Sequence, residues 1–355
     1  MRLSFRPTEW WSKFAIRMSA ARLVGFAGVA LCASLYAQNV PIISGGLGML
    51  GSANTGVDFF QPVLAPVVAV PIGSHLLAEA RWDFREFYNQ DNRTGPYHST
   101  FFKSTQALQL DYLANRRLTV VAGRFLTPFN TYNERLSAVW QQNFQDAPIV
   151  SALGTRTTGS SDGVMLRSNA YSNEKVQVST TAYYSTRSNV DQFQSARSAG
   201  DRIEVYFPGK RIEIGTSYAR FLQSTHYNIG GVHFYWLPWS SPLQVRAEYA
   251  HAKGAQGYWI ETSYRLSQFK GPDSFLGRIE PLFRMQQSFR NKPFAGDGVP
   301  NVDVKQADFG LDYHFPHEVR FNSSYSRMFA STGNGNIWDM SLTYRFLFPA
   351  WRGKK

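Results

Sequence analysis

Residues 336–348 read Asn-Ile-Trp-Asp-Met-Ser-Leu-Thr-Tyr-Arg-Phe-Leu-Phe. Apolar side chains such as Trp338 and Met340 alternate there with polar ones, and the stretches 243–250 and 318–326 follow the same period of two. Successive side chains of a β-strand point to opposite faces, so each stretch predicts a strand with one apolar and one polar face. Helical periodicity is nearly absent after residue 40, which favours an all-β chain.

Sixteen strands are predicted, with fourteen as the alternative because the first candidate is rich in glycine. They lie near 42–51, 62–71, 75–88, 101–114, 117–126, 162–170, 174–186, 201–207, 211–222, 227–237, 242–251, 256–266, 277–287, 303–314, 318–329 and 337–348. Most even-numbered strands end in tight turns, whereas long connections are predicted at 89–100, 127–161, 187–200 and 288–302. Short periplasmic turns and long extracellular loops are typical of transmembrane antiparallel β-barrels, which is the predicted fold class. A soluble all-β protein is the alternative, because its strands alternate as well.

The N-terminal residues predict a cleavable signal peptide. Basic residues precede an apolar run at 23–36, and Ala37 precedes a polar pair. The run is too short to cross a bilayer as a helix, which takes about 20 residues. The sequence leaves open whether translation starts at Met1 or at Met18. We divide the chain into a signal peptide (1–37), a barrel (38–348) and a short C-terminal tail (349–355).

Composition limits the chemistry. The only cysteine, Cys32, lies within the predicted signal peptide, which excludes disulfides, thiolate metal sites and a cysteine nucleophile from the barrel. The mean hydropathy is −0.30 although 15% of residues are aromatic, as suits apolar residues outside and polar residues inside. Without the signal peptide the net charge is near +8, which suits loops that face lipopolysaccharide phosphates.

Common motifs for cofactors and metals are missing or out of context. The pattern Gly46-Leu-Gly48-Met-Leu-Gly51 fits the glycines of a dinucleotide site, but no βαβ unit surrounds it. The seven histidines are scattered, and none has a metal-ligand spacing on a helix. We therefore expect no cofactor, no metal and no nucleic-acid partner.

Two stretches carry a resemblance to outer-membrane porins of Gram-negative bacteria. The last strand, which ends Leu342-Thr-Tyr344-Arg-Phe346-Leu-Phe348, resembles the signal that the outer-membrane insertion machinery recognises, although a tail follows it here. Residues 120–136 resemble the strand and loop of porins related to the phosphate-selective family. The motifs that carry this resemblance are Gly123 and Phe125 at the strand end, Pro128 and Phe129 in the loop, and Asp162-Gly163-Val164 at the next strand.

The resemblance implies that loop 127–161 enters the lumen and constricts it, with a mobile surface loop as the alternative. Its candidate charges are Glu134, Arg135, Asp146 and Arg156. Polar faces of the strands predict further pore-lining residues, because a charge facing lipid costs roughly 2–4 kcal/mol near the midplane. The predicted cations are Lys103, Arg211, Arg246, Arg265, Arg278, Arg284, Arg320 and Arg345, and the anions are Asp111, Glu213, Glu248, Glu261, Glu280, Asp308, Asp312 and Asp339. These charges roughly cancel, and loop 127–161 has no cluster of cations that would indicate phosphate selectivity.

The expected function is passive diffusion of small hydrophilic solutes or ions across the outer membrane, by a barrel that the resemblance implies can be a homotrimer. A non-conducting structural or adhesin barrel is the second hypothesis. A barrel hydrolase is the third, because Asp312 and His314 share one strand face, as the Asp and His of omptin-type proteases do. That reading predicts catalysis at this pair alone, whereas a pore has no catalytic residues.

Overall fold

The protein is described by a computed structural model, which covers residues 40–54, 57–91, 95–153, 159–190, 193–223, 226–292 and 297–350. The predicted signal peptide (1–37) lies outside the described residues, and so do residues 351–355 of the predicted tail. Among the described residues, no helix is long and apolar enough to cross a membrane.

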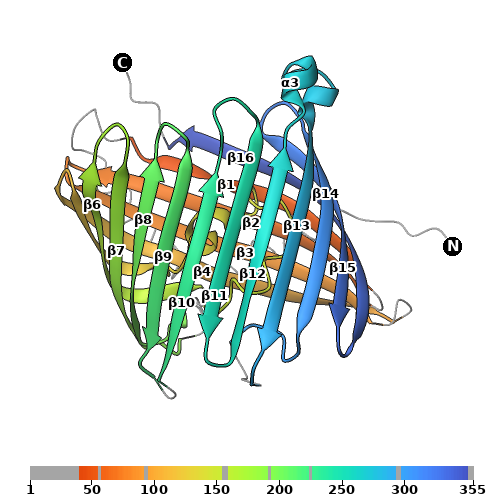
Figure 1. Cartoon of the computed structure of the whole chain (residues 1–355), viewed down its shortest axis with the longest axis horizontal. Helices are drawn as coiled ribbons and strands as arrows, with labels where there is room; N and C mark the ends of the chain where they lie inside the picture. Colours follow the sequence, from red (N-terminus) through yellow and green to blue (C-terminus); the bar gives the residue numbers. More distant parts are fainter. Residues whose placement is uncertain are drawn as a thin grey trace, which may run out of the picture.

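Sixteen antiparallel strands form one closed barrel, which confirms the predicted fold class and excludes fourteen strands. The strands are β1 (Ile42–Asn54), β2 (Val57–Ile72), β3 (Leu76–Asp91), β4 (Tyr97–Asn115), β5 (Leu118–Leu126), β6 (Ser160–Ser172), β7 (Gln177–Thr186), β8 (Ser198–Phe207), β9 (Ile212–Phe221), β10 (Tyr227–Trp236), β11 (Leu243–Ala252), β12 (Ala255–Tyr264), β13 (Ile279–Arg290), β14 (Val304–His314), β15 (Val319–Ala330) and β16 (Gly333–Pro349). Each strand pairs with its neighbours in the sequence, and β16 closes the barrel on β1 from Ile42↔Pro349 to Asn54↔Ile337. Figure 1 shows the tilted strands from the side.

The barrel is apolar outside and polar inside. On β16, Trp338 and Met340 are more than half exposed, while Asp339 between them is 2% exposed. Exposed aliphatic and aromatic side chains recur on the outer faces of the other strands, for example Val164, Ile260 and Phe309. Such an outer face is stable only against hydrocarbon, which identifies the barrel as a membrane-spanning one.

One connection is shorter than predicted, and another is an exception to the tight turns after even-numbered strands. The predicted long loop 89–100 shrinks to 92–96, because β3 and β4 extend into it. The connection 265–278, which joins β12 to β13, is long, although it lies at the barrel end with the short turns (Figure 1). It contains the helix α3 (Ser267–Lys270) and the 3₁₀-turn η4 (Leu276–Arg278). The connection 127–159 between β5 and β6 is the longest and contains the π-helical turn η2 (Tyr132–Leu136).

Candidate functional site

The described part of the connection between β5 and β6 lies within the barrel, where Figure 1 draws it in yellow between the front and back walls. Arg124, at the end of β5, fixes its start. The guanidinium donates to the Thr105 carbonyl at 2.6 Å and to the Asp162 carboxylate at 2.8 Å. The backbone amide of Thr127 donates to the Gly159 carbonyl at 3.0 Å, so the two ends of the connection are joined. We call the described residues 127–153 of this connection the docked loop.

The turn η2 binds the wall through charged pairs. Glu134 accepts from Arg202 of β8 at 2.6 Å and from Arg167 of β6 at 3.1 Å. Arg135 donates to Glu204 of β8 at 2.9 Å and to Glu213 of β9 at 2.5 Å. Such charge-assisted bonds restrict the turn to one position on the wall.

The pKa of Glu134 reflects these partners. Burial on its own raises the pKa of this carboxyl, but the adjacent guanidinium groups of Arg202 and Arg167 outweigh burial and lower it below its ordinary value. Glu134 is therefore an anion in the docked loop at neutral pH. Asp146 differs, because its pKa is raised, first by burial and further by Asp308, while Arg284 opposes the shift.

Glu248 of β11 closes the first turn of the docked loop. Its Oε1 accepts from the backbone amides of Thr131 and Tyr132 at 2.9 and 2.8 Å, and from the Thr131 hydroxyl at 2.9 Å. Its Oε2 accepts from the Trp259 indole at 3.3 Å. A buried carboxylate that binds several donors fixes the backbone as a cap fixes a helix end.

Later residues of the docked loop bind the wall on β12 to β15. Asn143 donates to Glu261 at 2.8 Å, and Arg284 donates to the backbone carbonyl of Asp146 at 2.9 Å. Arg320 of β15 donates to the backbone carbonyl of Gln142. Polar wall residues thus satisfy the loop backbone, which has no sheet partner in this part of the chain.

Two apolar clusters attach the docked loop to different parts of the wall. In the first, Phe129, Tyr132, Val150 and Leu153 pack with buried residues that include Trp259. The other wall members of this cluster are Ala219, Phe221, Ile229, Ala250, Ala252 and Ala255 of β9 to β12. In the second, Val139 and the partly buried Trp140 pack against Leu50, Val63 and Ala65 of β1 and β2. The loop therefore crosses the lumen between distant strands.

Glycines in the wall make room for these contacts. A Cβ atom at Gly46 of β1 would lie 2.5 Å from Cε3 of Trp140, and one at Gly257 of β12 would lie 2.5 Å from Cγ1 of Val150. Real Cβ contacts are essentially never that close, so both positions exclude larger residues while the loop is docked. Gly46 and Gly48 of the glycine pattern are thus part of a packing surface for Trp140 and its neighbour Val139.

Most of the predicted pore-lining residues lie inside the barrel. Asp111, Glu213, Arg246, Glu248, Glu261, Glu280, Arg284, Asp308, Asp312, Arg320, Asp339 and Arg345 occupy inner strand faces, and Glu134, Arg135 and Asp146 belong to the docked loop. Arg156 lies outside the described residues.

Four predicted lumenal cations were placed wrongly. In the strand register Lys103 of β4 lies opposite Phe84 of β3. Its neighbour Ser104 is buried on the inner face, so Lys103 lies on the outer face. Arg211 lies in the turn before β9 with a φ of 50° and stacks over Trp239 at 4.5 Å. Arg265 and Arg278 lie in the connection 265–278, because β12 ends earlier and β13 begins later than predicted.

Sequence reasoning also missed inner charges that alternate just as clearly. Those on the inner wall are Glu79, Arg81, Asp83 and Arg85 of β3, Arg167 of β6, Arg202 and Glu204 of β8, and Arg290 of β13. The spacing of two along β3 was the available signal. With these additions and corrections, carboxylates outnumber guanidinium groups on the inner wall and docked loop together.

Asp312 and His314 do not form a catalytic pair in this structure. His314 Nε2 lies 2.8 Å from Glu280 Oε2, whereas Asp312 Oδ1 accepts from Asn322 at 2.6 Å. Asp312 Oδ2 lies 3.3 Å from Nη1 of Arg320. Each group therefore has a different partner, and among the described residues no hydrogen bond joins the Asp312 carboxylate to the His314 imidazole, as general-base catalysis needs.

Comparison with solved structures identifies the same architecture in outer-membrane porins. OmpF of Salmonella typhi, solved with daunomycin, superposes with a TM-score of 0.57 at 12% identity, covering 88% of this chain and 99% of that one. The anion-selective porin of Comamonas acidovorans gives 0.58 at 8% identity, covering 87% and 100%. An outer-membrane protein of Vibrio cholerae, OmpT with loop L8 deleted, gives 0.54 at 10% identity, covering 87% and 100%. No protein-family model matches the sequence, and neither does any curated protein.

At these identities the likeness establishes the fold, which is that of sixteen-stranded porins. Together with the apolar outer face it identifies the chain as an outer-membrane β-barrel protein.

Proposed function

We propose that the barrel is a passive diffusion pore for small hydrophilic solutes and ions, and that the docked loop narrows it. The observation that carries the proposal is the docked loop itself, which buried ion pairs such as Glu134–Arg202 attach to a polar inner wall. A loop fixed in this way sets the cross-section of a lumen, because it cannot retreat to the barrel mouth without breaking those pairs.

Lumenal charge supports a weak preference for cations. Carboxylates exceed guanidinium groups inside the barrel, and charged rings set the selectivity of pores. The excess is small and many of the charges are paired, so the preference is expected to be slight. The resemblance of residues 120–136 to phosphate-selective porins stays a resemblance of sequence. The loop cation Arg135 is paired with Glu204 and Glu213 rather than free to bind phosphate.

A closed structural barrel is the second candidate function. It is favoured by the two apolar clusters, because a loop that packs on β1–β2 and also on β9–β12 crosses the lumen. In that case the barrel would have little conductance, and the connections 187–197 and 291–303 would form the surface that binds other molecules.

We propose no hydrolase activity, because Asp312 and His314 have separate partners. The homotrimer stays a prediction that light scattering of the purified protein would check.

Single-channel recording of the folded protein in a planar bilayer tests the two candidates. Large steady steps are expected for a pore, and the reversal potential in a salt gradient is expected to show a small cation preference. Absence of conductance from protein shown to be folded by circular dichroism would refute the pore and favour the structural barrel. A clear anion preference would refute the argument from lumenal charge.

A further inference from the structure

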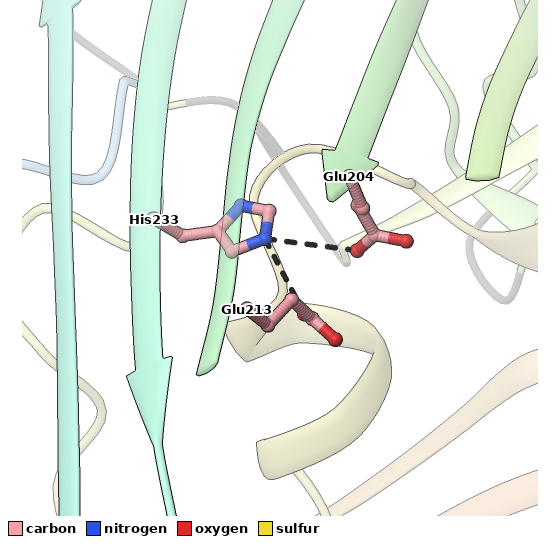
Figure 2. Close-up of side chains that lie close together, drawn as sticks. All are labelled: Glu204, Glu213 and His233. Atoms are coloured by element: carbon pink, nitrogen blue, oxygen red, sulfur yellow. Dashed lines mark ion pairs between the residues drawn. The ribbon is translucent and has the colours of Figure 1, made fainter. Parts of the chain in front are cut away.

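Three neighbouring strands place two carboxylates and one imidazole together on the inner wall. Glu204 of β8, Gly215 of β9 and His233 of β10 lie abreast in the strand register. Glu213 precedes Gly215 by two residues on the same face of β9. Figure 2 shows the His233 ring reaching toward Glu204 and Glu213.

Gly215 allows the ring to lie across β9. A Cβ atom there would be 2.2 Å from Cε1 and 2.6 Å from Nε2 of His233. Any larger residue at 215 would therefore displace the imidazole. The glycine directs Nε2 toward the two carboxylates, so the cluster depends on a position that has no side chain of its own.

The three ligand atoms have the spacing of a metal site. His233 Nε2 lies 3.4 Å from Glu213 Oε1 and 3.7 Å from Glu204 Oε1. Ligands 2.0–2.1 Å from a tetrahedral zinc ion are separated by about 3.3 Å. The distances thus suit one cation between these atoms with little movement, and the three atoms all lie within 4.8 Å of one another.

His233 is also left without a hydrogen bond. Its side chain is fully buried, and neither ring nitrogen has a hydrogen-bond partner among the described residues. A buried polar atom that makes no hydrogen bond destabilises the fold. A cation bound at Nε2 would remove part of that cost, which makes His233 an independent indication of a ligand.

Arg135 of the docked loop now binds the same oxygens, Glu204 Oε1 at 2.9 Å and Glu213 Oε1 at 2.5 Å. Its side chain is 43% exposed, so the guanidinium can move into solvent at modest cost. The hydroxyl of Ser179 donates to Glu204 Oε2 at 3.1 Å and keeps Oε1 turned to the cluster. A second positive charge lies close to the same carboxylate, because Arg202 Nε is 3.1 Å from Glu204 Oε1.

We propose that Glu204, Glu213 and His233 bind a divalent transition-metal cation of the zinc class, which displaces the guanidinium of Arg135. Two carboxylates neutralise the two positive charges, and the imidazole supplies the nitrogen that such cations prefer. The fourth position, vacated by Arg135, takes water. Magnesium and calcium are disfavoured, because both demand six or more oxygen ligands.

Binding has a consequence for the docked loop. Arg135 loses both wall partners when the cation binds, so the charged pairs of η2 are reduced to those of Glu134. The loop is expected to loosen at η2, so the metal acts on the constriction. This consequence rests on the proposed pore, whereas the binding itself does not.

A second cluster of two carboxylates and one imidazole provides a matched control. Glu280, Asp312 and His314 also bring their ligand atoms within 4.8 Å of one another. There His314 Nε2 already has a partner in Glu280 at 2.8 Å. Zinc is therefore expected to bind at the His233 cluster rather than at the His314 cluster.

Isothermal titration of the folded full-length chain in detergent with zinc chloride tests the proposal. Zinc is expected to bind, magnesium chloride is not, and His233→Ala and Glu213→Gln are each expected to weaken binding about 10-fold or more. His314→Ala should leave zinc binding unchanged. Arg135→Ala should tighten it, because the competing cation is removed. Circular dichroism confirms that each variant is folded.

Three results would overturn the proposal: no zinc binding, binding unaffected in both His233→Ala and Glu213→Gln, or binding lost in His314→Ala instead. Single-channel recording separates it from the proposed function. A conductance change with zinc that disappears in His233→Ala supports both, whereas zinc binding to a barrel that never conducts refutes the pore and leaves the metal site standing.

Discussion

Replacing Arg202 by Met should release the first part of the docked loop from the wall. The Arg202 side chain is 5% exposed and donates to Glu134 and to the Asn130 carbonyl, each at 2.6 Å. Removing one partner of a buried ion pair costs about 3–5 kcal/mol. Glu134 keeps Arg167, but that side chain is 40% exposed, so its pair contributes only about 0–1 kcal/mol. We therefore expect a cost near the lower limit, about 3 kcal/mol, which raises the undocked population by about 100-fold.

The assay is the rate at which a small charged thiol reagent labels a cysteine at position 138. Ala138 is 3% exposed in the docked loop, and the only natural cysteine, Cys32, is replaced by Ala in all variants. When opening is faster than labelling, the rate follows the population of the open form. Arg202→Met should label about 100-fold faster than the parent, and Arg167→Met, the matched control, only a few-fold faster. Equal rates in Arg202→Met and the parent would refute the claim that this ion pair fixes the loop.

Three further predictions concern the same interior. Gly46→Leu should push Trp140 off β1, because even a Cβ would lie 2.5 Å from that ring, and single-channel steps should then become larger or noisier. Gly51→Leu is the control and should not change the steps, because a Cβ at Gly51 has no neighbour nearer than 3.9 Å. The folded pKa of Glu134 is lowered, so its contribution to docking is present above its ordinary pKa of 4.5 and is lost as the pH falls through the lowered value. Current noise should therefore rise in acid at a pH below 4.5, and current that stays steady down to the pH at which the barrel unfolds would contradict this. Asp308→Asn should lower the melting temperature, because the buried Arg284, 2.6 Å away, loses its counter-ion at a cost of about 3–5 kcal/mol; an unchanged melting curve by circular dichroism would count against this pair as a stabilising one.

Period-two alternation was sufficient to predict the fold, because one face of each strand meets lipid and the other faces the barrel interior. Trp338 and Asp339 are adjacent in sequence, yet one faces lipid and the other is buried inside. The strand ends were harder to predict, since alternation continues into turns. Arg265 and Arg278 continue the pattern of their strands but lie beyond Tyr264 and before Ile279, where the chain has left the sheet. Charges near predicted strand ends are therefore weak evidence for a lumenal position.

The interior of the barrel was less predictable, because it depends on contacts between residues far apart in the chain. Glu134 meets Arg202, and Thr131 meets Glu248 more than a hundred residues away. Alternation places a carboxylate on the inner face but does not say which loop atom it binds. Arg202 itself was missed although it alternates correctly with Glu204, since no local pattern distinguishes an anchoring charge from a solvated one.

One local signal for the docked loop was nevertheless present in the sequence. The strand predicted at 227–237 is apolar on both sides, which leaves its faces ambiguous by alternation alone. In the structure, Val232 is 45% exposed on the outer face, whereas Ile229 is fully buried in the cluster that contains Phe129 of the docked loop. An inner face of a water-filled barrel has no reason to be apolar unless something covers it. A strand that is apolar on both faces in an otherwise alternating barrel therefore indicates where a loop docks, and the loop's own aromatic residues indicate which segment it is.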